Sequence, residues 1–280
     1  MTRYHPSMRF AMLVALVAAC GPAQHGGRPY PEPSVADIVA RLAKAHDATS
    51  SFRADATMDF WIGNKRAKGE VLVMSKAGAF VRFAALSPAG GSTMSEMACD
   101  GKDFVFVDYQ GNCYRTGPCN GSSIAQFFNI ELEPDDFLHL AVGTPPVLPG
   151  ATGTVTWDPK TGLENVDLTA GGKTEKLAID MTGGKLDVMN AEMTSGGKLE
   201  WSVANKDFVK VGDYRVPGKS HFKAPESQQD LIVDWGDAAN RAVNAALDAP
   251  KFQLAPPTGL QRCGGGGASS GGGGSAAGGP

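Results

Sequence analysis

The stretch that decides the fold is Phe52-Arg53-Ala54-Asp55-Ala56-Thr57-Met58-Asp59-Phe60-Trp61-Ile62. From Phe52 to Ile62 every second residue is apolar, and most of the residues between them are charged or polar. Successive side chains of a strand point to opposite faces, so this alternation predicts a β-strand with one buried face and one mostly solvated face. Such a strand is typical of an antiparallel sheet that is covered on one side.

Further strands are predicted after this stretch, where apolar runs are separated by turns that contain glycine. The run Phe104-Val105-Phe106-Val107 is apolar at every position, which indicates that this part of the sheet is covered on both sides. The other predicted strands of this group are Glu70–Met74, Phe80–Leu86 and Thr93–Cys99.

A repeated Gly-Gly-Lys pattern indicates a second group of strands. It occurs at Gly171-Gly172-Lys173, Gly183-Gly184-Lys185 and Gly196-Gly197-Lys198, at intervals of 12 and 13 residues. Since Gly-Gly favours tight hairpins, the pattern predicts an antiparallel meander of long strands. The meander is expected to include Leu177–Met181, Leu199–Ala204, Phe208–Val216 and Leu231–Trp235, followed by a short helix or ordered loop over Asp237–Leu247 and a last short strand over Phe252–Ala255.

Three helices are predicted beside the strands. Ser34 begins the first, because Pro33 prevents its extension backwards and Ser34 with Asp37 resembles a capping box. Ser122–Phe128 and Glu133–Val142 are short. In the second of these, proline and acidic residues suit the first turn and the positive end of the helix dipole, so the acids indicate a helix start rather than a metal site.

The N-terminus has the layout of a secretory signal peptide. Arg3 and Arg9 accompany the apolar run Phe10–Ala19, which is ten residues long and too short to span a bilayer core. The stretch Val17-Ala18-Ala19-Cys20 resembles a bacterial lipobox, which implies cleavage before Cys20 and acylation of this cysteine. Gly21 at the next position favours the outer membrane over the inner membrane.

These features predict four segments. Residues 1–19 are a signal peptide, and residues 20–33 carry lipidated Cys20 and a flexible tether. Residues 34–262 form the folded domain, and residues 263–280 form a disordered tail rich in Gly and Ser. The protein is therefore expected to face the periplasm from the outer membrane, held there by its lipid anchor.

Composition and motifs argue against several classes of function. The chain has 26 Lys and Arg against 29 Asp and Glu, so no basic excess indicates nucleic-acid binding. The usual catalytic motifs are missing, and His46, His139 and His221 have no nucleophile near them in the sequence, so we do not expect an enzyme. No histidine has metal-ligand spacing from a cysteine, so no metal or cofactor is expected.

Four cysteines follow Cys20, and an exported chain permits disulfides between them. If residues 93–117 form a meander, Cys99 and Cys119 lie at the same end of it, which favours a Cys99–Cys119 bond. A Cys113–Cys119 bond is the alternative, if the chain folds back at Gly117-Pro118. Sequence alone does not choose between them.

Three stretches, taken in order, resemble the LolA/LolB superfamily of lipoprotein carriers. Ser50-Ser51-Phe52-Arg53-Ala54 resembles the start of the family's first strand. Leu86–Thr93 with Asp100-Gly101-Lys102 resembles the loop and the hairpin after it, and Asp248–Leu260 resembles the closing strand. The resemblance covers most of residues 34–262. It implies a mainly β (α+β) fold, a strongly twisted antiparallel unclosed β-barrel with an N-terminal helix and inserted short lid helices.

The resemblance also implies that acyl chains of lipids or lipoproteins bind in an apolar cavity of this half-barrel, in the service of lipoprotein or lipid transfer. The alternative is a structural or scaffolding envelope lipoprotein with a filled core, which acts through a protein partner. The expected cavity residues are Met58, Phe60, Val73, Phe83, Met97 and Phe106, with Phe127, Phe128 and Phe137 on the lid helices.

Two positions depart from the family pattern. The soluble carrier has Arg-Pro after its second strand, where the arginine holds the lid, but this chain has Ser75-Lys76-Ala77. The anchored acceptor has a bulky leucine in a Pro-Leu-Gly turn, but this chain has Pro88-Ala89-Gly90. The lipobox favours the anchored acceptor over the soluble carrier.

Overall fold

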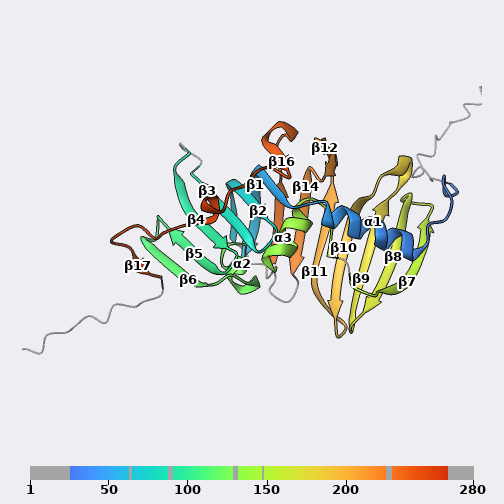
Figure 1. The fold of residues 1–280 in the computed structure, drawn as a ribbon, viewed down its shortest axis with the longest axis horizontal. Coiled ribbons are helices and arrows are strands. Elements are labelled where there is room, and N and C mark those ends of the chain that lie inside the picture. The colour runs from blue at the N-terminus through green and yellow to red at the C-terminus, as the bar shows by residue number, and fades with distance from the viewer. Residues whose placement is uncertain are drawn as a thin grey trace, which may run out of the picture.

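The computed structural model describes residues 26–62, 65–87, 91–128, 132–146, 148–224 and 229–263. The predicted signal peptide, Cys20, the Pro88-Ala89-Gly90 turn and the tail after Cys263 lie outside the described residues. The described strands form one large sheet and a separate sheet of two strands. The large sheet has 15 strands in the order β17-β6-β5-β4-β3-β2-β1-β15-β14-β11-β10-β9-β8-β7, with β16 paired to β1, and it is open (Figure 1).

The first half of the sheet is the meander that the alternating stretch predicts. That stretch lies in β1 (Ser51–Ile62), where the apolar side chains from Phe52 to Met58 are buried and Arg53 and Asp55 are exposed. The next strands, each antiparallel to the one before, are β2 (Lys65–Lys76), β3 (Phe80–Leu86), β4 (Thr93–Asp100), β5 (Asp103–Asp108) and β6 (Cys113–Pro118).

The second half of the sheet begins at the far edge and returns towards β1. Gly171 and Gly172 have φ angles of 58° and 77°, which allow the tight turn that the Gly-Gly pattern predicts. The predicted antiparallel meander is therefore confirmed. Its strands are β7 (Thr152–Asp158), β8 (Leu163–Ala170), β9 (Lys173–Asp180), β10 (Asp187–Ser195), β11 (Lys198–Lys206), β14 (Lys219–Ala224) and β15 (Gln229–Asp234).

The central strand β1 joins the two meanders. Its residues Thr57–Ile62 pair with Gln229–Asp234 of β15, and its residues Phe52–Ala54 pair with β16 (Arg241–Val243). Both partners come from the far end of the sequence. This pairing makes one continuous sheet out of two local ones.

One predicted strand of the second meander is wrong. Phe208–Val216 forms a hairpin outside the large sheet, in which β12 (Val209–Val211) pairs with β13 (Tyr214–Val216). The chain reverses at Gly212, whose φ of 59° suits a turn and interrupts an extended strand. The apolar pattern continues on both sides of this glycine, which is why the sequence predicts a single strand over Phe208–Val216.

The last predicted strand is also wrong. Phe252 ends the short 3-10 helix η4 (Ala249–Phe252), because Pro250 fixes a helical φ in its first turn. The C-terminal edge strand is instead β17 (Gln261–Arg262). Within Asp237–Leu247 the chain has a 3-10 turn, η3 (Ala238–Asn240), and then β16, in place of a helix.

The α-helices lie on one face of the sheet, which we call the inner face (Figure 1). α1 (Val35–Asp47) begins at the predicted capping box and buries Ile38 and Leu42. α2 (Gly121–Phe128) and α3 (Pro134–Ala141) connect the two meanders. None of the helices in the described residues is long and apolar enough to cross a membrane.

Both edges of the sheet are shielded. At one edge Trp157 of β7 donates its indole N–H to the carbonyl of Gly26 at 3.0 Å, and its ring meets the Tyr30 ring edge-on. Arg28 forms a two-point ion pair with Glu164 of β8, at 2.7 Å and 3.1 Å. Residues 26–30, which the sequence places in a flexible tether, are thus held against the domain and cover an edge that would otherwise be open to other strands.

Two disulfides fasten the other edge. Cys99 of β4 is bonded to Cys119, the first of the two pairings that the sequence leaves open. Cys113 of β6 is bonded to Cys263, which follows the short parallel pair of β17 with β6. Cys99 is completely buried, so the first bond lies in the core and the second lies at the rim.

We predict different effects from removing the two disulfides. Replacing Cys99 and Cys119 with serine should lower the free energy of unfolding by about 3 kcal/mol, because a buried cross-link is lost. Replacing Cys113 and Cys263 should mainly release β17, since only two residues of this strand pair with β6. Chemical denaturation and amide exchange of β17 measure the two effects, and equal losses of global stability would contradict this assignment.

Candidate ligand-binding site

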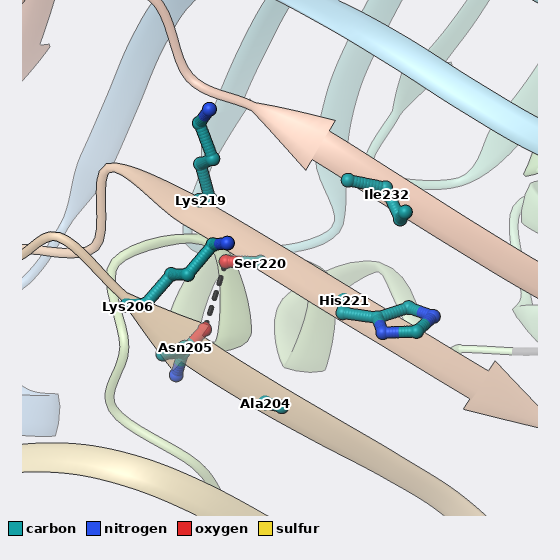
Figure 2. A pocket seen from close by; sticks show the side chains of 7 residues that line it. All are labelled: Ala204, Asn205, Lys206, Lys219, Ser220, His221 and Ile232. Atoms are coloured by element: carbon teal, nitrogen blue, oxygen red, sulfur yellow. Dashed lines mark hydrogen bonds between the residues drawn. The ribbon is translucent and has the colours of Figure 1, made fainter.

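The outer face of the sheet carries a small hollow over β11, β14 and β15 (Figure 2). Its volume is about 190 Å³, below the roughly 300–1,000 Å³ of typical ligand pockets. The Lys219 ammonium lies 3.0 Å from Asp234, and His221 is paired with Asp230, so acidic partners offset these side chains. The hollow is therefore a poor site for an acyl chain. It is lined by Ala204, Asn205, Lys206, Lys219, Ser220, His221 and Ile232.

The inner face brings several predicted cavity residues together. The strand register places Val73, Phe83, Met97 and Phe106 side by side, in one row across β2, β3, β4 and β5. Val73, Phe83 and Met97 are completely buried, and Phe106 is half-buried against the same core. Met58 of β1 is also buried in this core.

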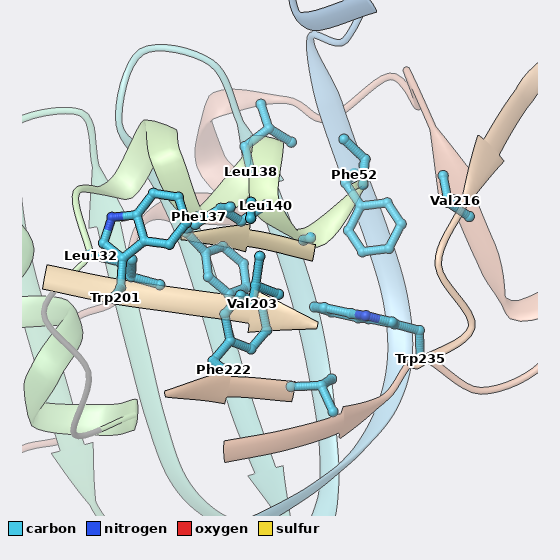
Figure 3. Packing of buried hydrophobic residues seen from close by; sticks show 14 of the residues in the cluster. Phe52, Leu132, Phe137, Leu138, Leu140, Trp201, Val203, Val216, Phe222 and Trp235 are labelled. Carbon is cyan, nitrogen blue, oxygen red and sulfur yellow. The ribbon is translucent and has the colours of Figure 1, made fainter. Parts of the chain in front are cut away.

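The helix α3 covers this row with Phe137 (Figure 3). The Phe137 ring meets Phe83 edge-on at a centroid distance of 4.9 Å, and Trp235 lies 6.5 Å away on its other side. Phe137 is only 2% exposed, so its side chain occupies the space above the sheet. The side chains of Phe60, Phe127 and Phe128, which the sequence also predicts to line a cavity, lie outside the described residues.

Trp235 is a central inner-face residue that the sequence prediction missed. Its indole N–H donates to the Ser220 hydroxyl at 2.9 Å, and that hydroxyl donates to the Asn205 side chain at 2.8 Å. The Asn205 amide then donates to the Val188 carbonyl at 3.0 Å. The signal for Trp235 was present, since it continues the buried alternation of Leu231 and Val233.

The first turn of α3 is held by one carboxylate. Asp135 accepts hydrogen bonds from the backbone N–H groups of Gly78 and Ala79, at 2.9 Å and 2.8 Å. Both donors belong to the turn between β2 and β3, directly after Ser75-Lys76-Ala77, where the family's lid-holding arginine is missing. A different contact therefore ties the helix to the same turn of the sheet.

The last turn of α3 is held by a pair of stacked imidazoles. His139 is buried, and its ring lies 3.4 Å from the His46 ring at the end of α1. Burial and the adjacent His46 lower the pKa of His139 to about 4. Two imidazolium rings in this position would repel each other, and the buried His139 is the ring whose lowered pKa keeps it neutral.

No other chemistry stands out among the described residues. They contain no group of three or more His, Cys, Asp or Glu side chains that could hold a metal ion. His139 and His221 lie in separate environments, one under α1 and the other beside Asp230 on the outer face. The inner face under α3 is therefore the best candidate for a binding site.

Solved structures with the same architecture are known. The LolA superfamily protein NE2245 from Nitrosomonas europaea has a TM-score of 0.52 and 12% identity, over 80% of this chain and 99% of that one. This chain has the LolA-like fold. A putative outer membrane lipoprotein-sorting protein domain from Vibrio parahaemolyticus has a TM-score of 0.51 and 13% identity, over 76% of this chain and 94% of that one.

A DUF1329 family protein from Desulfovibrio piger also has this LolA-like fold, with a TM-score of 0.50 and 14% identity, over 78% of this chain and 95% of that one. Neither a family profile nor a curated protein sequence matches the chain. The resemblance that the sequence indicates is thus confirmed at the level of the fold. The open sheet with few helices is the architecture that it implies.

We predict that His139 makes the domain less stable in acid. Its folded pKa of about 4 lies below the ordinary histidine pKa of about 6.5, so the unfolded chain binds the proton more readily. The contribution of neutral His139 to the free energy of unfolding is fully present above about pH 6.5. It is lost as the pH falls towards 4, which lowers that free energy by up to about 3 kcal/mol. Denaturation of the wild type and of His139→Phe from pH 7.5 to 4.5 measures it, and the variant should show the shallower decline.

Proposed function

We propose that this protein binds acyl chains of lipids or lipoproteins between the inner face and α3, without covalent chemistry. The observation that supports this most is the cover of the inner face. An open apolar sheet is covered at its centre by an eight-residue helix in place of a second sheet. Such a cover can move without unfolding the strands beneath it.

The energies involved favour a displaceable lid. Phe137, Leu138 and Leu140 of α3 are all buried, and their burial stabilises the closed form by about 2 kcal/mol each. The two hydrogen bonds of the exposed Asp135 carboxylate add about 1–3 kcal/mol. An acyl chain of about 16 carbons gains roughly 0.8 kcal/mol per buried CH₂, which amounts to about 12 kcal/mol. A bound chain can therefore replace the contacts of α3 and still leave a favourable balance.

We further propose that Cys20 carries the lipid anchor at the periplasmic side of the outer membrane. In that case only five residues lie between Cys20 and Gly26, which is held against Trp157. The six extended Cα–Cα steps from Cys20 to Gly26 span at most about 20 Å. The β7 edge of the sheet would therefore face the membrane from close range, where a lipid chain has a short path to the inner face.

The alternative, a scaffolding lipoprotein with a filled core and an envelope protein partner, has one observation in its favour. Phe137 already fills the space above Phe83 and is almost completely buried. The two functions make opposite predictions for Phe137→Ala. A carrier should keep its fold and bind acyl probes at least as well as before, whereas a filled core should lose about 3–5 kcal/mol of stability and bind no probe.

The direct test is extraction of the protein from its native membrane, followed by mass spectrometry of bound lipids. We expect acylated molecules to accompany the folded protein in stoichiometric amounts. The same sample should bind a fluorescent fatty acyl probe in a saturable way. A protein that is free of lipid and binds no such probe would overturn the proposed function.

We predict that Asp135 controls the speed of ligand exchange. Replacing Asp135 with alanine removes both hydrogen bonds to the β2–β3 turn, so the first turn of α3 should open more readily. Stopped-flow fluorescence should then show probe uptake and release about tenfold faster, with a smaller change in affinity. The control is Asp158→Ala at the β7–β8 turn, which removes similar turn contacts far from α3. Equal rates for the two variants would exclude a lid role for Asp135.

A further inference from the structure

One carboxylic acid on the inner face has no partner. Glu175 of β9 is 1% exposed, and neither of its side-chain oxygens has a hydrogen-bond partner among the residues that the structure describes. Glu164 of the neighbouring strand β8 is buried as deeply, but Arg28 neutralises it through two contacts. Native proteins pair nearly all buried polar groups, so an unpartnered carboxyl suggests that something else supplies the partner.

The surroundings of Glu175 are apolar. The strand register places it between Leu168 of β8 and Met193 of β10, and both are buried in the core. On its own strand Leu177 shares its face, whereas Lys176 points to the exposed side. This environment suits a hydrocarbon chain, apart from the one carboxyl group in it.

The start of the lid lies within electrostatic range of this end of β9. Burial raises the pKa of Asp136 in α3, and the charge of Lys173, two residues before Glu175, offsets part of that effect. Movement of α3 would therefore change the surroundings of this part of the strand. The charged or titratable groups that this region brings together are Asp135 and Asp136 of α3, Glu133 directly before it, His46 of α1 and Lys173 of β9.

Glu175 itself is uncharged at neutral pH. Burial raises the pKa of this carboxyl to about 8, and no nearby charge contributes to the shift. A neutral carboxylic acid keeps one O–H donor, and it has no acceptor in the present structure. An acceptor oxygen that enters this apolar space without a charge of its own would match that donor.

We infer that Glu175 is the polar contact of the acyl-chain site and donates a hydrogen bond to the carbonyl oxygen of an acyl ester. This inference rests on the proposed function and narrows its ligand class. An ester carbonyl only accepts hydrogen bonds and is neutral, so it matches the single donor. An ionised fatty acid would bring a charge between Leu168 and Met193, which their apolar side chains cannot offset.

The test compares two probes of equal length on the full mature protein, a pyrene-labelled acyl methyl ester and the corresponding pyrene alkane. Glu175→Leu should weaken binding of the ester about tenfold and leave binding of the alkane within about twofold of the wild type. Glu175→Gln keeps an N–H donor and should restore most of the ester affinity. Glu192→Leu, on the exposed side of β10, is the matched control and should change neither the affinity for the ester nor that for the alkane.

The pH dependence provides a second readout. Ester binding by the wild type should weaken as the pH rises from 7 to 9, because the donor is lost when Glu175 ionises, whereas Glu175→Gln should show no such decline. Thermal unfolding at pH 7 verifies that Glu175→Leu is folded, and we expect it to melt at a higher temperature than the wild type since an unpaired polar group is removed.

The outcomes separate this inference from the proposed function. Equal ester binding by Glu175→Leu and the wild type would overturn the role of Glu175, while saturable alkane binding would still support an acyl-chain site. The same decline with pH in Glu175→Gln would also overturn it. If the wild type binds neither probe, the proposed function fails and the inference fails with it.

Discussion

The structure depends on the pairing of β1 with β15. Each meander by itself is a local sheet with an apolar face and two free edges. The hydrogen bonds between Thr57–Ile62 and Gln229–Asp234 merge them into one sheet with a shared inner face. The core then runs across both halves, from Val81 and Phe104 on one side to Val166 and Ile179 on the other. Because this sheet is open, its apolar face needs a cover from elsewhere in the chain.

That cover comes from short helices, and this has consequences for function. α1 packs on the half that contains β7, and α3 packs on the centre near β1, β2 and β3. A helix of eight residues adds few contacts compared with the strand ladders beneath it. At the centre of the inner face, a ligand can therefore replace the protein's own side chains with the least disruption of the sheet. The buried Phe137 marks this position in the closed form.

Among the described residues, the buried carboxylates follow one physical rule with one exception. Buried carboxylates have a cationic partner, as Glu164 has Arg28 and Asp187 has Arg215 at 2.7 Å. Glu175 has none, although it is buried to a similar extent. Residues that break the pairing rule inside an otherwise consistent structure are expected at functional sites. The helix α3 has a related feature in His139, which stacks on His46 and is kept neutral by its lowered pKa.

The sequence by itself determined the local elements of this protein. Alternation from Phe52 to Ile62 identified β1, the Gly-Gly pairs identified the hairpins of the second meander, and Ser34 with Asp37 identified the start of α1. Such elements arise from contacts between residues close in the chain, so periodicity and turn chemistry are enough to find them. Only the tertiary structure decided the pairing of β1 with β15, the bond between Cys113 and Cys263, the contact of Asp135 with the β2–β3 turn and the isolation of Glu175. Those features join or separate residues that lie far apart in the chain, and no local pattern carries information about which distant group will be the neighbour.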